Sequence, residues 1–181
     1  MNERILRVAL VQDRDHGSVE DNLANIETRV AEAAARGAKL VLLQELHNGA
    51  YFCQHEHCDE FDRAEPIPGP STERRGALAK RHGVVIVGSL FERRAAGLYH
   101  NTAVVLEADG RLVGKYRKMH IPDDPGFYEK FYFTPGELAF PPFAPPLRRP
   151  APLLCGVPSY SDAHRLLRLA LPSFVTAPSP I

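Results

Sequence analysis

Two short apolar runs joined by one amphipathic segment constrain the fold of this chain more than any other feature. Residues 5–12 (ILRVALVQ) and residues 39–44 (KLVLLQ) are rich in branched apolar side chains, which is typical of buried strands. Between them, apolar residues recur at helical spacing after a capping start at Ser18, and Gly37 is placed to end the helix predicted over residues 20–36. This unit predicts two parallel, neighbouring strands joined by a helix, and therefore an α/β fold.

The following residues predict one more helix and an antiparallel hairpin. A proline-rich loop precedes a helix over residues 71–82, which Ser71 is placed to cap, and residues 84–90 predict a third buried strand. Two further strands flank the pair Asp109-Gly110, which is a strong signal for a hairpin turn. The pattern therefore predicts a sheet with both parallel and antiparallel pairing.

Charge and composition narrow the classes of partner. Lys+Arg and Asp+Glu number 22 each, so a net charge of zero argues against a partner such as nucleic acid or an anionic membrane. No apolar run is long enough to span a bilayer, and the first residues lack the cleavage site of a secretory signal. The three cysteines form no disulfide framework, which fits a reducing, cytoplasmic setting. These features fit a soluble cytoplasmic enzyme, as they fit many other proteins.

The composition changes abruptly near residue 141. Ten of the 16 prolines lie in residues 141–181. Proline at this density removes hydrogen-bond donors and blocks a central strand, so this part predicts an irregular tail with one short helix over residues 162–169. The predicted division is a domain over residues 4–140 and a divergent proline-rich tail over residues 141–181.

Two long segments contain the residues that are best suited to catalysis. The segment QELHNGAYFCQ places Glu45 at the end of an apolar strand, where α/β folds place reactive groups and where burial favours a general base. The segment RKMHIPDDPGFYEKFYFTPG contains Lys118 and Glu129. Taken alone, each feature also has a structural explanation. Glu45 fits a helix-capping or surface glutamate, and the charges around Lys118 fit a solvated charge run. The aromatic residues around Glu129 fit core packing.

Together the two segments resemble amidases of the nitrilase superfamily, and their residue sequences are similar to those of N-carbamoylputrescine amidohydrolases. The resemblance runs in order from about residue 4 to about residue 140. It implies an incomplete αββα sandwich, of which this chain contains only the first part, and homo-oligomeric full-length members. It also implies hydrolysis of the carbamoyl C–N bond of N-carbamoylputrescine to putrescine, carbon dioxide and ammonia. The expected partner is a small amide or carbamoyl-amine substrate, with no cofactor and no metal.

The resemblance further implies a Glu–Lys–Cys triad. Glu45 takes the position of the general base, and Lys118 takes the position of the lysine that stabilises the oxyanion. Glu129 matches a second glutamate that positions the lysine and the substrate. Cys155 stands at the position of the nucleophile when residues are counted on from Thr134.

The surroundings of Cys155 depart from the family pattern. The family follows its nucleophile with Trp-Asp or a similar pair, whereas Gly-Val-Pro follows here, and Pro158 has no backbone N–H. Pro150 and Pro152 interrupt the expected apolar strand before it. We therefore expect little or no turnover, and two alternatives stay open: a truncated, inactive member of the family, or an amidase for another carbamoyl or amide substrate.

A competing motif is the run CQHEHC, from Cys53 to Cys58. Cysteine and histidine are zinc ligands, but four ligands within six residues differ from the usual two-pair spacing. The resemblance places this loop beside the substrate pocket and assigns Cys53 to it rather than to the nucleophile position. We therefore expect no metal site here.

Overall fold

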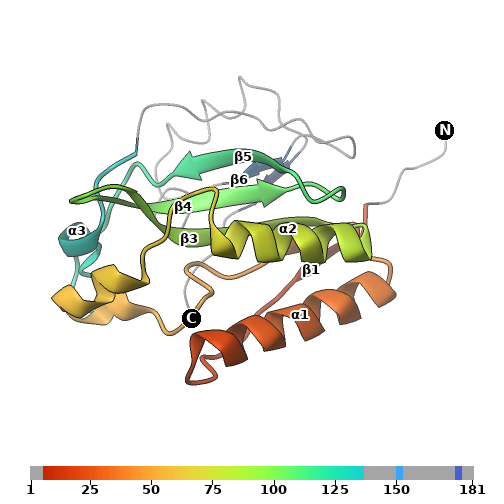
Figure 1. The fold of residues 1–181 in the computed structure, drawn as a ribbon, viewed down its shortest axis with the longest axis horizontal. Helices are drawn as coiled ribbons and strands as arrows, with labels where there is room; N and C mark the ends of the chain where they lie inside the picture. Colours follow the sequence, from red (N-terminus) through yellow and green to blue (C-terminus); the bar gives the residue numbers. More distant parts are fainter. Residues whose placement is uncertain (1–5, 137–149, 153–173, 177–181) are drawn as a thin grey trace.

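The computed structural model describes residues 6–136, 150–152 and 174–176. In this part of the chain, a mixed five-stranded sheet has the order β1-β2-β3-β4-β5, and helices α1 and α2 lie on one side of it (Figure 1). The α/β class predicted from the sequence is therefore confirmed. In chain order the elements are β1 (Val8–Leu10), α1 (Val19–Ala35), β2 (Leu40–Leu42), η1 (Phe52–Gln54), η2 (Cys58–Arg63), α2 (Pro70–His82), β3 (Val85–Ala95), β4 (Leu98–Leu106), β5 (Leu112–Arg117), α3 (Glu129–Tyr132), β6 (Pro150–Pro152) and β7 (Phe174–Thr176).

The β1–α1–β2 unit forms as its hydrophobic pattern predicts. Strands β1 and β2 pair in parallel, and β2 pairs in parallel with β3. Helix α1 follows Ser18, whose hydroxyl accepts a hydrogen bond from the backbone N–H of Asp21 and so satisfies one donor of the first turn. Just beyond the helix, Gly37 has a φ of +83°, a conformation that glycine adopts without a Cβ clash.

Helix α2 begins one residue earlier than predicted, and Ser71 is not its cap. The N-cap is Gly69, whose N–H donates to the hydroxyl of Thr72, and Pro70 occupies the first turn. Proline fits there because it has no N–H to leave unsatisfied and its φ is already helical. Ser71 lies inside the first turn instead, where its backbone N–H donates to Oε2 of Glu65 at 3.0 Å.

Strands β3, β4 and β5 form an antiparallel meander. The predicted turn at Asp109-Gly110 joins β4 to β5, and Gly110 has a φ of +92°. Strand β3 continues to Ala95, beyond the predicted end at residue 90, because β4 pairs with it from Ile86 to Ala95. A second tight turn at Gly97, with a φ of +73°, joins these two strands.

Both faces of the central strands are buried. On the helix side, Ile86 and Leu106 pack with Ile26 and Val30 of α1 in the main hydrophobic cluster. The alternate residues of β3 and β4 point to the opposite face and are also buried, as Val87 illustrates. Asn101 of β4, which is described below, lies on this second face.

The edge strand differs from its prediction. Residues 5–12 were expected to form a buried strand, yet 43% of Val8 and 74% of Leu10 are exposed. Strand β1 is the end strand of the sheet, and it pairs with β2 alone among the described strands. An end strand has one unpaired edge, so its side chains have fewer neighbours than those of a central strand.

Most of the predicted tail lies outside the described residues, including the short helix expected over residues 162–169. Within it, β6 pairs in parallel with β7 in a two-stranded sheet, where both strands are edge strands, a position that tolerates proline. The boundary near residue 141 stays a prediction. Across the described part of the chain, none of the helices combines the length and apolar character that a membrane span requires.

Candidate active site

Glu45 lies just beyond the carboxyl end of β2, in a turn that the core holds tightly. The next residue, Leu46, has a φ of +51°, an uncommon conformation for a side chain with a Cβ. Its backbone N–H donates to the hydroxyl of Ser89 on β3 at 2.7 Å, so the neighbouring strand stabilises the turn. The turn directs the Glu45 side chain into the interior, where it is completely buried.

Lys118 follows the last residue of β5 and reaches Glu45 in the interior. Its backbone N–H donates to the carbonyl of Asn101 on β4, which continues the sheet pairing by one residue. Its Nζ atom lies 3.0 Å from Oε1 of Glu45, and both side chains have no exposed surface. The predicted contact between Glu45 and Lys118 is therefore confirmed.

Glu129 completes the charged cluster at the first residue of α3. Both of its carboxylate oxygens accept hydrogen bonds from Nζ of Lys118, at 2.9 and 2.8 Å. The hydroxyl of Tyr51 donates to Oε1 of Glu129 at 2.8 Å. The loop around Glu129 is tied to the loop after Glu45 because the N–H of Tyr128 donates to the carbonyl of Cys53.

Two residues of the cluster, Asn101 and Tyr51, were not predicted as site residues. The side-chain amide of Asn101 donates to Oε1 of Glu45 at 2.7 Å, and Asn101 is fully buried. A sequence signal for Asn101 does exist: it is a polar residue at the start of the apolar run NTAVVL. A buried amide in such a run needs a hydrogen-bond partner. Tyr51 gave no such signal, because an aromatic residue in an aromatic loop is typical of core packing.

The second oxygen of Glu45 is available for chemistry. Oε1 accepts from Lys118 and Asn101, whereas Oε2 is buried and accepts no hydrogen bond within the described residues. An unpaired buried carboxylate oxygen is costly in a purely structural role, and is suited to accept a proton or an N–H from a bound molecule.

The surroundings shift the pKa values of both partners. Burial raises the pKa of the Glu45 carboxyl to about 7; the positive charge of Lys118 opposes this and the negative charge of Glu129 adds to it. For Lys118, burial acts to lower the pKa, but the two carboxylates outweigh burial and raise it. At neutral pH the lysine is therefore charged, while Glu45 is poised between its acid and base forms, as general base catalysis requires.

The two cysteines of the loop after Glu45 have contrasting environments. Cys53 is buried in an aromatic cluster with Phe52, Phe91 and Tyr132, and burial raises the pKa of its thiol well above the usual range. Cys58 is exposed. Among the residues that the structure describes, no group of three or more His, Cys, Asp or Glu side chains could hold a metal ion. Cys155, the predicted nucleophile, lies outside the described residues.

The architecture matches solved structures of one class of enzyme. A carbon-nitrogen hydrolase from Helicobacter pylori superposes with a TM-score of 0.93 at 41% identity, over 97% of this chain and 60% of that chain. An amidase of the nitrilase superfamily from Nesterenkonia gives a TM-score of 0.84 at 22% identity, over 96% of this chain and 64% of that one. This chain therefore has the fold of nitrilase-superfamily structures, and it matches them over part of their length.

Sequence comparison identifies the family within this class. The family described as Carbon-nitrogen hydrolase matches residues 7–167, and the chain belongs to this family. The N-carbamoylputrescine amidase of Solanum lycopersicum is 40% identical over 92% of this chain and 55% of its own length. The citrullinase of Francisella tularensis is 33% identical over 97% of this chain and 62% of its own length. The chain thus spans little more than half the length of these curated relatives.

Proposed function

We propose that this chain hydrolyses the carbamoyl C–N bond of N-carbamoylputrescine, with Glu45, Lys118 and Cys155 as catalytic residues and Glu129 as their positioning residue. One observation carries the proposal: Lys118 is held between two buried carboxylates, and one oxygen of Glu45 has no hydrogen-bond partner within the described residues. A cation fixed in this way suits stabilisation of an oxyanion, and a glutamate with a pKa of about 7 suits proton transfer. The 40% identity to an N-carbamoylputrescine amidase supports the choice of substrate.

In the proposed reaction, the free oxygen of Glu45 takes the thiol proton of Cys155. The thiolate attacks the carbamoyl carbon, and the ammonium of Lys118 stabilises the oxyanion of the tetrahedral intermediate. Collapse of the intermediate breaks the bond to the terminal nitrogen, which leaves as ammonia with the proton from Glu45. Glu45 then takes a proton from water, and the hydroxide attacks the acyl-enzyme. The thiolate leaves and regains its proton from Glu45, and the released carbamic acid decomposes to the amine and carbon dioxide.

Citrulline is the second candidate substrate, since a citrullinase is among the relatives. Citrulline and N-carbamoylputrescine share the carbamoyl-amine group and differ in the carboxylate that citrulline adds at the far end. The buried cluster acts on the shared group, so it supports both substrates equally. The choice between them depends on groups that contact the far end.

The experiment measures ammonia release from both substrates by the purified chain, beside Cys155→Ala, Glu45→Gln and Cys58→Ser variants. We expect slow release that is abolished in Cys155→Ala and Glu45→Gln, because each removes a reacting group, and retained in Cys58→Ser. The rate is expected to be low because Gly-Val-Pro follows Cys155 where the family has Trp-Asp or a similar pair. Loss of one oxyanion donor costs about a hundredfold or more.

Mass spectrometry of the intact chain after incubation with substrate detects an acyl adduct even when turnover is slow. Release that is equal in the unmodified chain and in Cys155→Ala, without an adduct, would reject the enzymatic proposal for this chain. Its membership of the family would be unaffected.

A further inference from the structure

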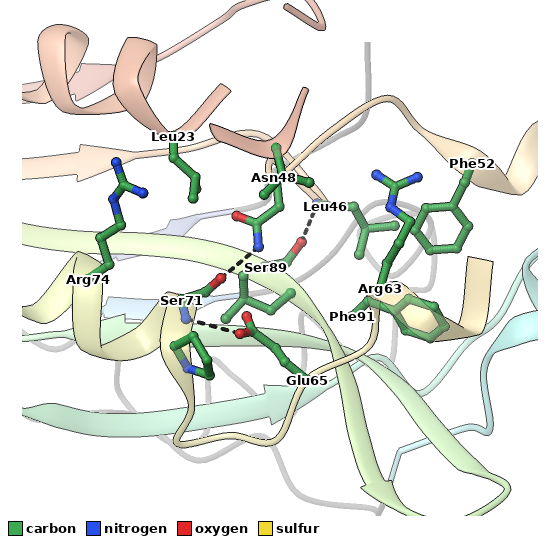
Figure 2. A pocket seen from close by; sticks show the side chains of 13 residues that line it. Leu23, Leu46, Asn48, Phe52, Arg63, Glu65, Ser71, Arg74, Ser89 and Phe91 are labelled. Carbon is green, nitrogen blue, oxygen red and sulfur yellow. Dashed lines mark hydrogen bonds between the residues drawn. The ribbon is translucent and has the colours of Figure 1, made fainter. Parts of the chain in front are cut away.

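A cavity separate from the charged cluster lies between the sheet and the first turns of α1 and α2 (Figure 2). Its volume is about 290 Å³, near the lower end of the range for small-molecule sites. Leu46, the residue after Glu45, forms part of its wall, whereas Glu45, Lys118 and Glu129 do not line it. Most of the wall is apolar, with Leu23 on one side and Phe91 on another.

The polar part of the wall is formed by Glu65, Ser71 and Ser89, which lie together in Figure 2. Oε2 of Glu65 accepts the backbone N–H of Ser71, whereas Oε1 is buried and has no partner in the part of the chain that the structure describes. The hydroxyl oxygens of Ser71 and Ser89 each accept one hydrogen bond, from the amide of Asn48 and from the N–H of Leu46. Because a hydroxyl oxygen has two lone pairs, each retains one for a ligand.

The backbone holds this carboxylate in place. Glu65 extends the sheet beyond the carboxyl end of β2, since its N–H donates to the carbonyl of Phe91 and its own carbonyl accepts from the N–H of Arg93. The position of the Glu65 side chain therefore depends on sheet pairing and on the first turn of α2. A site held by regular elements in this way is organised before a ligand arrives.

Charge determines which ligand fits. Glu65 is the one carboxylate among the residues that line the cavity. Two guanidinium groups also line it, but both are already paired: Arg63 with Glu60 at 2.6 Å, and Arg74 with two glutamates of α1 at 2.6 and 2.8 Å. Their charges are therefore largely compensated. The positive charge of Arg75 also acts on Glu65, but Arg75 does not line the cavity. Among the described residues, Glu65 is thus a carboxylate of the wall that forms no ion pair.

We propose that this cavity binds a primary alkylammonium ion. The three N–H donors of the ammonium match three acceptors, which are Oε1 of Glu65 and the hydroxyl oxygens of Ser71 and Ser89. A short alkyl chain lies along the leucine and phenylalanine side chains. The proposal does not depend on the proposed reaction, because binding is measured without turnover.

The test titrates the full ¹⁵N-labelled chain with butylamine at pH 7 and follows the backbone amide resonances. Butylamine is expected to shift the signals of Ser71 and Leu46 to saturation, with a dissociation constant of about a millimolar, as befits so small a ligand. 1-Butanol has the same chain length without the charge, and it is expected to bind at least about tenfold more weakly.

Glu65→Gln is the decisive variant, because the amide oxygen can still accept from the N–H of Ser71 while its NH₂ group faces the ammonium. It is expected to weaken butylamine binding by at least about tenfold, whereas the matched variant Glu73→Gln, at an exposed position outside the cavity, leaves binding unchanged. Equal binding by Glu65→Gln, or no saturable shift at Ser71 and Leu46, would overturn the proposal. If Glu65→Gln does not fold, equal affinity of the unmodified chain for 1-butanol and butylamine would overturn it instead.

Discussion

The Nζ atom of Lys118 and the Oε1 atom of Glu45 lie 3.0 Å apart, although 73 positions separate the two residues in the sequence. Glu45 follows β2 and Lys118 follows β5, so β3 and β4 lie between their strands in the sheet. Asn101 of β4 bridges the gap, because it bonds the backbone of Lys118 and the side chain of Glu45. The cluster therefore connects the parallel and antiparallel parts of the sheet.

Replacing Lys118 with methionine is expected to destabilise the chain by about 3–5 kcal/mol at pH 7, because two buried carboxylates lose their cation. Without the ammonium the folded state binds protons more readily than the unfolded state, so the loss of stability should shrink as the pH falls from 7 to 5. Urea unfolding at both pH values measures this. The control is Lys130→Met, whose exposed partner Asp123 lies 3.8 Å away; an equal loss in both variants would contradict the prediction.

Glu45 should make the stability of the unmodified chain depend on pH. Its pKa is about 7 in the folded state and 4.5 in its unperturbed state, so the folded chain retains a proton that the unfolded chain releases. This contribution is present below pH 4.5 and is lost as the pH rises through 7, by about 3 kcal/mol in total. Denaturant unfolding of the unmodified chain and of Glu45→Gln over this window should give a flatter dependence for the variant. Parallel curves would show that Glu45 ionises normally.

Tyr51→Phe removes the hydrogen bond to Glu129 and retains the ring. We expect a loss of about 1–2 kcal/mol in the free energy of unfolding, since the acceptor is a buried carboxylate. The matched control is Tyr99→Phe, whose ring packs against Phe61 and Phe91 and should tolerate the change. Chemical unfolding of both variants makes the comparison. A Tyr51→Phe variant as stable as its parent would argue against a role for the hydroxyl in holding Glu129.

Gly76→Ala tests the packing of α2 against the β4–β5 turn. Alanine in a helix normally stabilises by about 0.5–1 kcal/mol relative to glycine. Here a Cβ would lie 2.5 Å from the carbonyl oxygen of Gly110, so the backbone must move and we expect a net loss of about 1–3 kcal/mol. Thermal or chemical unfolding of the variant gives the sign directly. A stabilised variant would mean that the helix and the turn are not in contact.

Cys53 and Cys58 should differ sharply in reactivity. Alkylation by iodoacetamide at pH 8 is expected to modify the exposed Cys58, whereas Cys53 is buried with a raised thiol pKa and should react only after unfolding. Mass spectrometry of the digested peptides reports each cysteine separately, and Cys58→Ser shows that protection of Cys53 does not depend on its neighbour. Rapid labelling of Cys53 in the native chain would contradict its burial.

Sequence reasoning succeeded where short-range rules apply. The spacing of apolar residues, the hydroxyl of Ser18 and the position of Gly37 predicted helix α1, and Asp109-Gly110 predicted the turn between β4 and β5. The same rules failed for the α2 cap, because Gly69 and Thr72 together satisfy the first turn in place of Ser71. The contact of Glu45 with Lys118 was foreseen from a family resemblance, since no local pattern relates positions so far apart.

The sequence by itself therefore determined helices α1 and α2, the five strands of the main sheet and the identity of the charged residues, because each depends on neighbours within a few positions. Only the tertiary structure decided that Leu10 is exposed at the edge of the sheet and that Asn101 and Tyr51 hold the carboxylates. It also decided that one oxygen of Glu45 has no partner among the residues that the structure describes. These outcomes depend on which strands pair and in which register. They also depend on how far burial removes each group from water, and that environment exists only once distant segments have packed together.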